Sequence, residues 1–471
     1  MRTGERLLIA SLLFASVAVT LAAPSGVESW LRQSFDASGV PGMVAVVTSG
    51  GEDVIAAYGR DGRGQPMSAR SLLRVASLTK TVTAVAVHQL AEQGRIGLDD
   101  PVIRYLPAFR LADARYTRIT VQHLLDNRSG LRDGRLDLSA LNRSASLQDY
   151  VAGLQHASLA SDPGAARAYC NANWEILARL VEVVTGILYD EHLRSSLFAP
   201  LQMTQSTVAV ANVDPPGGYQ EIFGFHVRRA DHVLFSASSG SNGLVTTAGD
   251  LLQWTRWLAT GEPGGILRPA TRARLIARAL EARTTDGFEA SGDRLGKSGM
   301  QMTEMSHLLI DPARGTGAAV VVNTSDMHGS AFAIASGALD VIEGRARAPL
   351  GHAARFTNVG YAAALILAAW LGGRGVRRAG RWAVRRRDAG RAGTLGRLVW
   401  LPLLTVPVIG LPQIVGMLTL GTRTISWTQI TYLLLTPLVV LVGVAGAGLA
   451  VFVARLRAYQ SDRLDTHARR E

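Results

Sequence analysis

The residues best suited to chemistry are a serine and a lysine three positions apart, Ser77 and Lys80, in the stretch VASLTK. They begin a good helical stretch, and this spacing puts both side chains on one helix face, with the amine one turn beyond the hydroxyl. A serine hydroxyl is a weak nucleophile until a neighbouring base takes its proton, and a lysine amine can serve if its pKa is lowered. The pair predicts a nucleophilic serine, although the same spacing is also typical of an ordinary exposed helix.

The scarcity of lysine favours the chemical interpretation. Of 49 lysines and arginines only two are lysines, Lys80 and Lys297, and the remaining 47 are arginines. An arginine guanidinium stays protonated at any workable pH, so only lysine can act as a proton acceptor at position 80. The second lysine lies in RLGKSGMQMTEMSHLLI, just ahead of two expected strands.

The elements that must position these residues can be read from periodicity. An opening helix is expected over 27–38 and two strands over 42–50 and 52–59, with two more strands over 305–324 and a helix over 330–343. Between them, roughly 100–285, apolar residues recur every three or four positions, which indicates helices. The predicted fold is α/β: an antiparallel sheet flanked by helices, with an inserted, mostly helical lobe.

The formal charge of +12 lies outside the main domain. The segment 374–397 carries nine Arg against one Asp, and the tail 455–471 carries five Arg against three acids, whereas residues 24–373 balance at 32 basic and 32 acidic. A domain with no net charge lacks the excess of positive charge that binds nucleic acid, so no nucleic-acid partner is expected. The sequence has no HExxH motif, no CxxC cluster and no Gly-rich phosphate loop, so neither a metal nor a cofactor is expected. The absence of GxSxG argues against an ordinary α/β-hydrolase.

Apolar stretches near both termini predict export and membrane attachment. Residues 1–23 are typical of a secretory signal, with an uncleaved N-terminal anchor as the alternative. Three charge-free stretches are each near the length of a transmembrane helix, namely 356–373, 398–422 and 424–454. The basic loop 374–397 and the tail 455–471 are then cytoplasmic, and the domain at 24–350 lies on the extracytoplasmic side of the cell membrane. Membrane lipid is therefore an expected partner, and no protein partner is indicated.

Three short motifs occur in an order that resembles a known family. They are Ser77-Leu-Thr-Lys80, Tyr169-Cys170-Asn171 and Lys297-Ser298-Gly299, and phrases such as ITVQHLLDNRSGL (119–131) and NGLVTTAGDLLQW (242–254) support them. The chain resembles the penicillin-recognising serine hydrolases, the branch that contains class C β-lactamases, D-alanyl-D-alanine carboxypeptidases and related esterases. The resemblance covers about residues 25–345 and implies the β-lactamase/transpeptidase-like fold.

The resemblance also implies a role for each motif residue. Ser77 would be the acylated nucleophile, Lys80 its proton partner and Tyr169 the general base that also protonates the leaving group. Asn171, Lys297, Ser298 and Gly299 would bind the substrate, and the backbone N–H groups of Ser77 and Met300 would form the oxyanion hole.

Two features depart from the family pattern or compete with it. Ser298 stands where Thr is usual, which keeps the hydroxyl, and MQMTEM follows where many relatives have a glycine-rich run, so the shape of the substrate stays open. None of the three motifs places a histidine beside Cys170, so this thiol is interpreted as a buried bystander with no part in the reaction.

The expected function is an exported, membrane-anchored serine hydrolase that works through an acyl-serine. Its substrate would be a small molecule or peptide of the cell envelope, a D-alanyl peptide of cell wall or a β-lactam. Two alternatives remain: an esterase on the same scaffold, and a non-catalytic penicillin sensor or wall-binding module.

Overall fold

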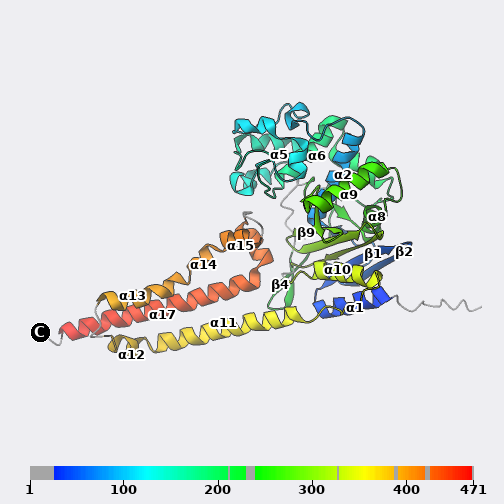
Figure 1. Cartoon of the computed structure of the whole chain (residues 1–471). Coiled ribbons are helices and arrows are strands. Elements are labelled where there is room, and N and C mark those ends of the chain that lie inside the picture. Colours follow the sequence, from blue (N-terminus) through cyan, green and yellow to red (C-terminus); the bar gives the residue numbers. More distant parts are fainter. Residues whose placement is uncertain are drawn as a thin grey trace, which may run out of the picture.

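The computed structural model describes residues 26–209, 213–229, 239–325, 328–386, 391–419 and 425–468. A sheet with helices on both faces forms the centre, a helical lobe covers one side of it, and an arm of helices extends from the other end (Figure 1). The predicted signal or anchor at 1–23 lies outside the described residues.

Seven strands form one antiparallel sheet in the order β2-β1-β11-β10-β9-β8-β7. The first strand pairs with the last along its whole length, with Met43 opposite Val322 and Ser49 opposite Thr316. The predicted union of early and late strands in one sheet is therefore confirmed. The strands are β1 Gly42–Ser49, β2 Glu52–Gly59, β7 Thr284–Thr285, β8 Phe288–Ser291, β9 Arg294–Gln301, β10 Glu304–Asp311 and β11 Thr316–Val322.

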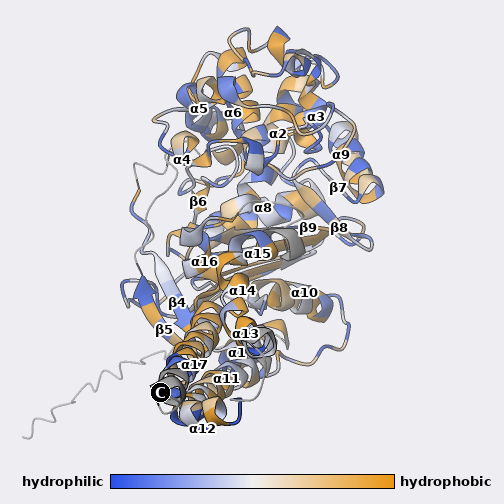
Figure 2. Ribbon diagram, turned by 90° about the vertical axis from the view of Figure 1, so that its left-hand side faces the viewer, coloured by the Kyte–Doolittle hydropathy of each residue, from blue (hydrophilic) through white to orange (hydrophobic). Residues whose placement is uncertain are grey.

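Both faces of the central strands are buried, because side chains alternate between two hydrophobic clusters. Met43 and Val47 of β1 pack with helices α1 (Gly26–Ser38) and α10 (Ser330–Ile342) on one face. Val44 and Val46 pack on the other face with α8 (Ala248–Thr260) and the helical lobe. Figure 2 shows this layering, with α8 above the sheet and α1 and α10 below it. The helices predicted at the two ends of this domain are confirmed.

Helices dominate the middle of the chain, as predicted. They are α2 Thr79–Glu92, α3 Val121–Leu125, α4 Leu138–Leu141, α5 Leu147–Gly153, α6 Ala172–Thr185, α7 Tyr189–Leu193 and α9 Pro269–Ala282. Two small strand pairs were not anticipated: β3 Leu73–Arg74 with β6 Val245–Thr246, and the hairpin of β4 Gly218–Ile222 and β5 Phe225–Arg229.

The arm is built from seven helices in the described part of the chain. They are α11 Ala353–Arg377, α12 Ala379–Val384, α13 Arg391–Leu403, α14 Val406–Ile409, α15 Leu411–Thr419, α16 Trp427–Leu433 and α17 Leu435–Ala468. By length and composition, two stretches of the described residues could cross a membrane, Arg355–Arg377 in α11 and Leu435–Asp462 in α17.

Of the three predicted spans, the one at 398–422 is therefore not a single long helix in its described part, which ends at Thr419. This stretch is long and apolar, but it is divided among α13, α14 and α15. Pro402, Pro407 and Pro412 interrupt it. Proline has no backbone N–H to donate, and its ring clashes with the carbonyl four residues earlier, so closely spaced prolines break a helix into short pieces.

The arm nevertheless passes three times along its own length (Figure 1). Helices α11 and α17 pack together, and both start beside the domain and run away from it. The broken α13–α15 segment, which separates them in sequence, runs back toward the domain along the other side of α17. Small residues allow α11 and α17 to approach closely: a Cβ on Gly372 would lie 2.8 Å from the Cβ of Ala447. The basic segment around α12 and the end of α17 lie together at the far end of the arm.

Candidate active site

Ser77 lies in a short 3-10 turn, Ala76–Leu78, that leads directly into α2. This helix is buried from Thr79 through Leu90, so it lies in the interior of the domain. Its stretch TVTAVAV offers small and apolar side chains on every face, which suits a helix enclosed by the sheet on one side and the lobe on the other. The alternative of an exposed surface helix is therefore wrong.

The amine of Lys80 is held at the serine by three oxygen atoms. Its Nζ donates to Ser77 Oγ at 3.0 Å and to the carbonyl oxygen of Ser241 at 2.8 Å, and it lies 3.5 Å from Asn242 Oδ1. The side chain has no exposed surface. The predicted placement of the amine one turn beyond the hydroxyl is confirmed.

Tyr169 brings a second proton-transfer group to the same hydroxyl. Its phenolic oxygen is 2.9 Å from Ser77 Oγ, and the residue lies just before α6. The amines of Lys80 and Lys297 each lie 5.0 Å from the centroid of its ring. Positive charge near a phenol favours its phenolate form. The two lysines of the chain therefore flank one tyrosine.

The other two residues of this motif differ in what they offer. The Oδ1 atom of Asn171 is buried, and no described residue donates a hydrogen bond to it. Buried acceptors are normally satisfied, so a substrate N–H is a suitable partner. Cys170, the single cysteine of the chain, is fully buried, which agrees with its interpretation as a bystander.

The third motif lies on β9, at the edge of the site. Lys297 Nζ donates to Glu289 Oε1 at 2.6 Å, and Ser298 Oγ is 2.9 Å from His307 Nδ1. Burial alone would raise the pKa of Glu289, but the charge and hydrogen bond of Lys297 outweigh this effect and lower the pKa. Burial lowers the pKa of His307 to about 4, against the opposing charge of Glu289, so the ring is neutral near pH 7. The hydroxyl at position 298 thus faces a neutral imidazole.

Strand β9 also approaches the backbone of the serine turn. A Cβ on Gly299 would lie 2.3 Å from the carbonyl oxygen of Val75 and 3.1 Å from the amide nitrogen of Ser77, so only glycine fits. Ala76, just before the serine, has φ +47°, a conformation that costs about 1–2 kcal/mol for a residue with a side chain. Ser306 Oγ stabilises this strained turn by donating to the Val75 carbonyl at 2.8 Å. Met300 is the next residue along β9.

A loop at 240–242 completes the site, although none of its residues was predicted to belong there. Asn242 Oδ1 accepts a hydrogen bond from Ser77 Oγ at 2.9 Å, while its Nδ2 donates to Ser241 Oγ at 3.0 Å. Thr83 Oγ1 of α2 donates to the Gly240 carbonyl at 2.6 Å. Asn242 begins a phrase typical of the family, which is the only signal in the sequence that could have identified it.

Glu175 supports this loop from α6. It is fully buried, and its Oε2 accepts a hydrogen bond from the Gly240 N–H at 2.9 Å. Burial raises its pKa to about 7, while the Gly240 N–H and the charge of Lys80 act in the opposite direction. Its only sequence signal is a charged residue on the buried part of an otherwise apolar helix, ANWEILARLVEVVT.

Comparison with known proteins shows the family. The beta-lactamase family matches residues 27–341, more than half of the chain, so the protein belongs to this family. Penicillin-binding protein 4 of Amycolatopsis lactamdurans is 32% identical over 170 residues, 36% of this chain and 44% of that protein. The D-alanyl-D-alanine-carboxypeptidase/endopeptidase AmpH of Escherichia coli K12 is 27% identical over 234 residues, 48% of this chain and 60% of that protein. The chain spans less than two thirds of the length of each relative.

Solved structures share the fold. The octameric penicillin-binding protein homologue from Pyrococcus abyssi has a TM-score of 0.58 at 20% identity, covering 68% of this chain and 77% of that one. EstCE1, a hydrolase with promiscuous acyltransferase activity, has a TM-score of 0.55 at 23% identity, covering 66% and 97%. The D-amino acid amidase from Ochrobactrum anthropi has a TM-score of 0.56 at 21% identity, covering 68% and 99%. The predicted family and fold class are confirmed.

The approach of β9 to the serine turn can be tested with one added methyl group. Gly299→Ala should push β9 away from Ser77 and slow acylation by a fluorophosphonate probe by about 100-fold. The matched control is Gly264→Ala, since a Cβ on Gly264 would meet nothing within 4 Å. Circular dichroism checks that both variants fold, and an unchanged labelling rate in Gly299→Ala would contradict the tight contact.

The raised pKa of Glu175 predicts a pH-dependent stability. Folded Glu175 keeps its proton up to about pH 7, whereas the unfolded chain releases it near 4.5, so this group's contribution is full below pH 4.5 and is lost as pH rises through 7. The stability difference between Glu175→Gln and wild type should therefore shift by roughly 3 kcal/mol in favour of the variant between pH 4.5 and pH 8. Comparing urea unfolding at these two pH values cancels other titrating groups, His307 included. A difference independent of pH would contradict the assignment.

Proposed function

We propose that this beta-lactamase-family protein is an exported, membrane-anchored serine hydrolase that acts through an acyl-Ser77 intermediate. Its substrates are amides or esters of the cell envelope, with D-alanyl peptides of cell wall or β-lactams as the class. The observation that carries the proposal is the Ser77 hydroxyl placed 3.0 Å from an amine and 2.9 Å from a phenol, both buried or half-buried.

The mechanism follows from these contacts. Tyr169, as phenolate between two ammonium groups, takes the proton of Ser77 while Oγ attacks the substrate carbonyl carbon. The resulting oxyanion is bound by the N–H groups of Ser77 and Met300. Tyr169 then gives its proton to the departing nitrogen or oxygen as that bond breaks, which leaves an acyl-serine. A water molecule, deprotonated by Tyr169, attacks the acyl carbon and releases the acid, and Ser77 regains its proton.

Lys80 and Asn242 serve this reaction by orientation and charge. The Lys80 amine contacts Ser77 Oγ directly, and Asn242 Oδ1 fixes the hydroxyl from another side. Asn171, with its unsatisfied Oδ1, would accept a hydrogen bond from the substrate amide N–H. Lys297 and Ser298 on β9, beside Gly299, would face the substrate's carboxylate or its equivalent.

Membrane anchoring is supported by the arm. Helices α11 and α17 contain stretches of 23 and 28 residues, which are roughly 35 and 42 Å long at the rise of an α-helix. Side chains typical of a bilayer interface lie beside the basic end of the arm, with Arg374 over Trp370 and Arg455 over Trp382. Arginines concentrate at this end, so it would be the cytoplasmic one, and the hydrolase domain would lie outside.

The role of Lys80 is tested by keeping its positive charge while replacing the compact amine that contacts Ser77 Oγ with a larger, planar guanidinium. Lys80→Arg should slow labelling of Ser77 by a fluorescent fluorophosphonate by about 10²- to 10⁴-fold. Ser77→Ala should abolish labelling, and Cys170→Ala should leave it within about twofold of wild type because the thiol has no part in the reaction. Full labelling of Ser77→Ala would contradict the proposal.

One observation favours a second candidate, an esterase or amidase for substrates without a free carboxylate. The ion pair between Lys297 and Glu289 neutralises the cation that would attract a substrate carboxylate. Ser298, which could bind the same group, is engaged with His307. Both contacts weaken the attraction of this edge of the site for an anion.

Removing the acid should move the preference between the two candidates. In Glu289→Gln, Lys297 is released from its ion pair, so kcat/KM for a D-alanyl-D-alanine peptide should rise about tenfold relative to that for a neutral p-nitrophenyl ester, equivalent to about 1.4 kcal/mol. The control is Glu281→Gln, which removes an exposed acid on α9. If the ratio of the two kcat/KM values is the same in wild type and Glu289→Gln, the ion pair does not govern substrate choice.

A further inference from the structure

The β4–β5 hairpin is fixed at the place where α11 and α17 leave the domain. Phe223 lies in the turn between β4 and β5, and its backbone N–H donates to Thr436 Oγ1, in the first turn of α17, at 2.9 Å. On the other side, Asn358 in the first turns of α11 donates to the Glu221 carboxylate. The turn of the hairpin is thus bonded to the outer ends of both candidate spanning helices.

One face of this hairpin carries two exposed apolar side chains on β5, Phe225 and Val227. Gln220 lies opposite Val227 and Ile222 lies opposite Phe225, so these four side chains share a face. Gln220 donates to the carbonyl oxygen of Tyr432 at 3.3 Å, which turns this face toward α16 and α17. Yet Phe225 is 74% exposed and Val227 is 56% exposed. The described part of the domain leaves both side chains uncovered on the side from which the arm extends.

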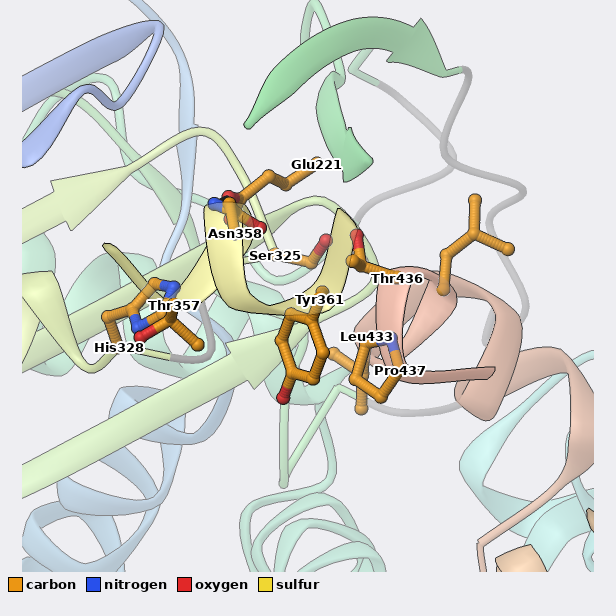
Figure 3. Close-up of a pocket in the computed structure, with 10 residues that line it drawn as sticks. Glu221, Ser325, His328, Thr357, Asn358, Tyr361, Leu433, Thr436 and Pro437 are labelled. Atoms are coloured by element: carbon orange, nitrogen blue, oxygen red, sulfur yellow. Dashed lines mark hydrogen bonds between the residues drawn. The ribbon is translucent and has the colours of Figure 1, made fainter. Parts of the chain in front are cut away.

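A recess beside the hairpin has an amphiphilic lining. Its volume is about 210 Å³, and Figure 3 shows Glu221 and Asn358 on one side of it and Leu433 and Pro437 on another. Tyr361 of α11 lies across it. Such a change from polar to apolar groups over a short distance is what the headgroup level of a bilayer requires, and tyrosine is enriched there.

Contacts with α16 fix the hairpin beside the arm. The guanidinium of Arg229, on β5, lies 3.4 Å from the ring centroid of Tyr432, which is buried. Trp427, at the start of α16, is 47% exposed, and tryptophan is enriched where helices enter the membrane surface. The exposed side chains of the hairpin therefore lie on an element that is packed against the arm.

We infer that the β4–β5 hairpin is a membrane-seating element, whose Phe225 and Val227 insert into the headgroup and acyl-chain boundary of the bilayer that α11 and α17 span. The inference rests on the proposed membrane anchoring. It has a consequence for the catalytic domain, because β4 is also bonded to the core: the Tyr219 N–H donates to the carbonyl oxygen of Asn323, just after β11, at 2.8 Å. The hairpin would hold the domain at a fixed tilt over the lipid surface.

Spin labels on single cysteines test this inference on the full chain in phosphatidylethanolamine and phosphatidylglycerol nanodiscs. In a Cys170→Ala background, the variants Phe225→Cys and Val227→Cys carry labels on the hairpin. Ile366→Cys, 70% exposed on α11, is the lipid reference, and Leu188→Cys, 69% exposed between α6 and α7, is the water reference. Collision rates with oxygen and with a water-soluble nickel chelate are measured by electron paramagnetic resonance.

Labels at 225 and 227 should collide with oxygen more than with nickel, as at 366 and opposite to 188. If the label at 366 reports lipid while both hairpin labels report water, the hairpin does not insert into the bilayer, although α11 still anchors the protein. If 366 also reports water, the anchoring itself is wrong. Hairpin labels shielded from both reagents would mean that a protein, such as a second copy, covers this face, which would also overturn the inference. Val227→Cys keeps the test valid if Phe225→Cys fails to fold.

Discussion

The buried amine of Lys80 is the constraint on which the rest of the site depends. An ammonium group taken out of water costs several kcal/mol unless oxygen atoms replace its hydration. Here Ser77 Oγ, the Ser241 carbonyl and Asn242 Oδ1 do so. Because the amine has no exposed surface, water does not screen its charge from the neighbouring groups Ser77, Tyr169 and Glu175. Ser77 is one of these groups, so the buried charge of Lys80 would also influence the reactivity of the Ser77 hydroxyl.

The fold meets this constraint by assembling four distant parts of the chain. The 3-10 turn at Ala76–Leu78 supplies the serine and α2 the lysine, the segment before α6 supplies Tyr169, the loop at 240–242 supplies acceptors, and β9 closes the edge. The pairing of β1 with β11 completes the sheet on which this assembly is built. The absence of a side chain at Gly299 lets β9 approach the strained turn at Ala76 closely. Catalytic geometry and sheet closure are therefore parts of one packing arrangement.

The features of the fold and site that could be predicted from the sequence depend on residues close together in the chain. The spacing of Ser77 and Lys80, the apolar run of β1 and the periodicity of α6 are properties of short segments, and each correctly indicated its element. Asn242 and Glu175 could not be assigned in this way, because their partners lie 165 and 65 positions away, and the contact of His307 with Ser298 depends on the register between β9 and β10. The stretch 398–422 differs from these: its apolar composition and length predicted one spanning helix, but Pro402, Pro407 and Pro412 divide its described part among three helices.

The central claim is that Ser77 forms a covalent acyl intermediate on this scaffold. Its most direct test is the intact mass of the full chain in detergent, followed over time after mixing with benzylpenicillin, with digestion to locate any adduct. The account predicts the gain of one penicilloyl group, located on the peptide that contains Ser77, followed by its loss as the acyl-serine is hydrolysed. No adduct on a folded protein that also resists fluorophosphonate, or an adduct on any other residue, would contradict it.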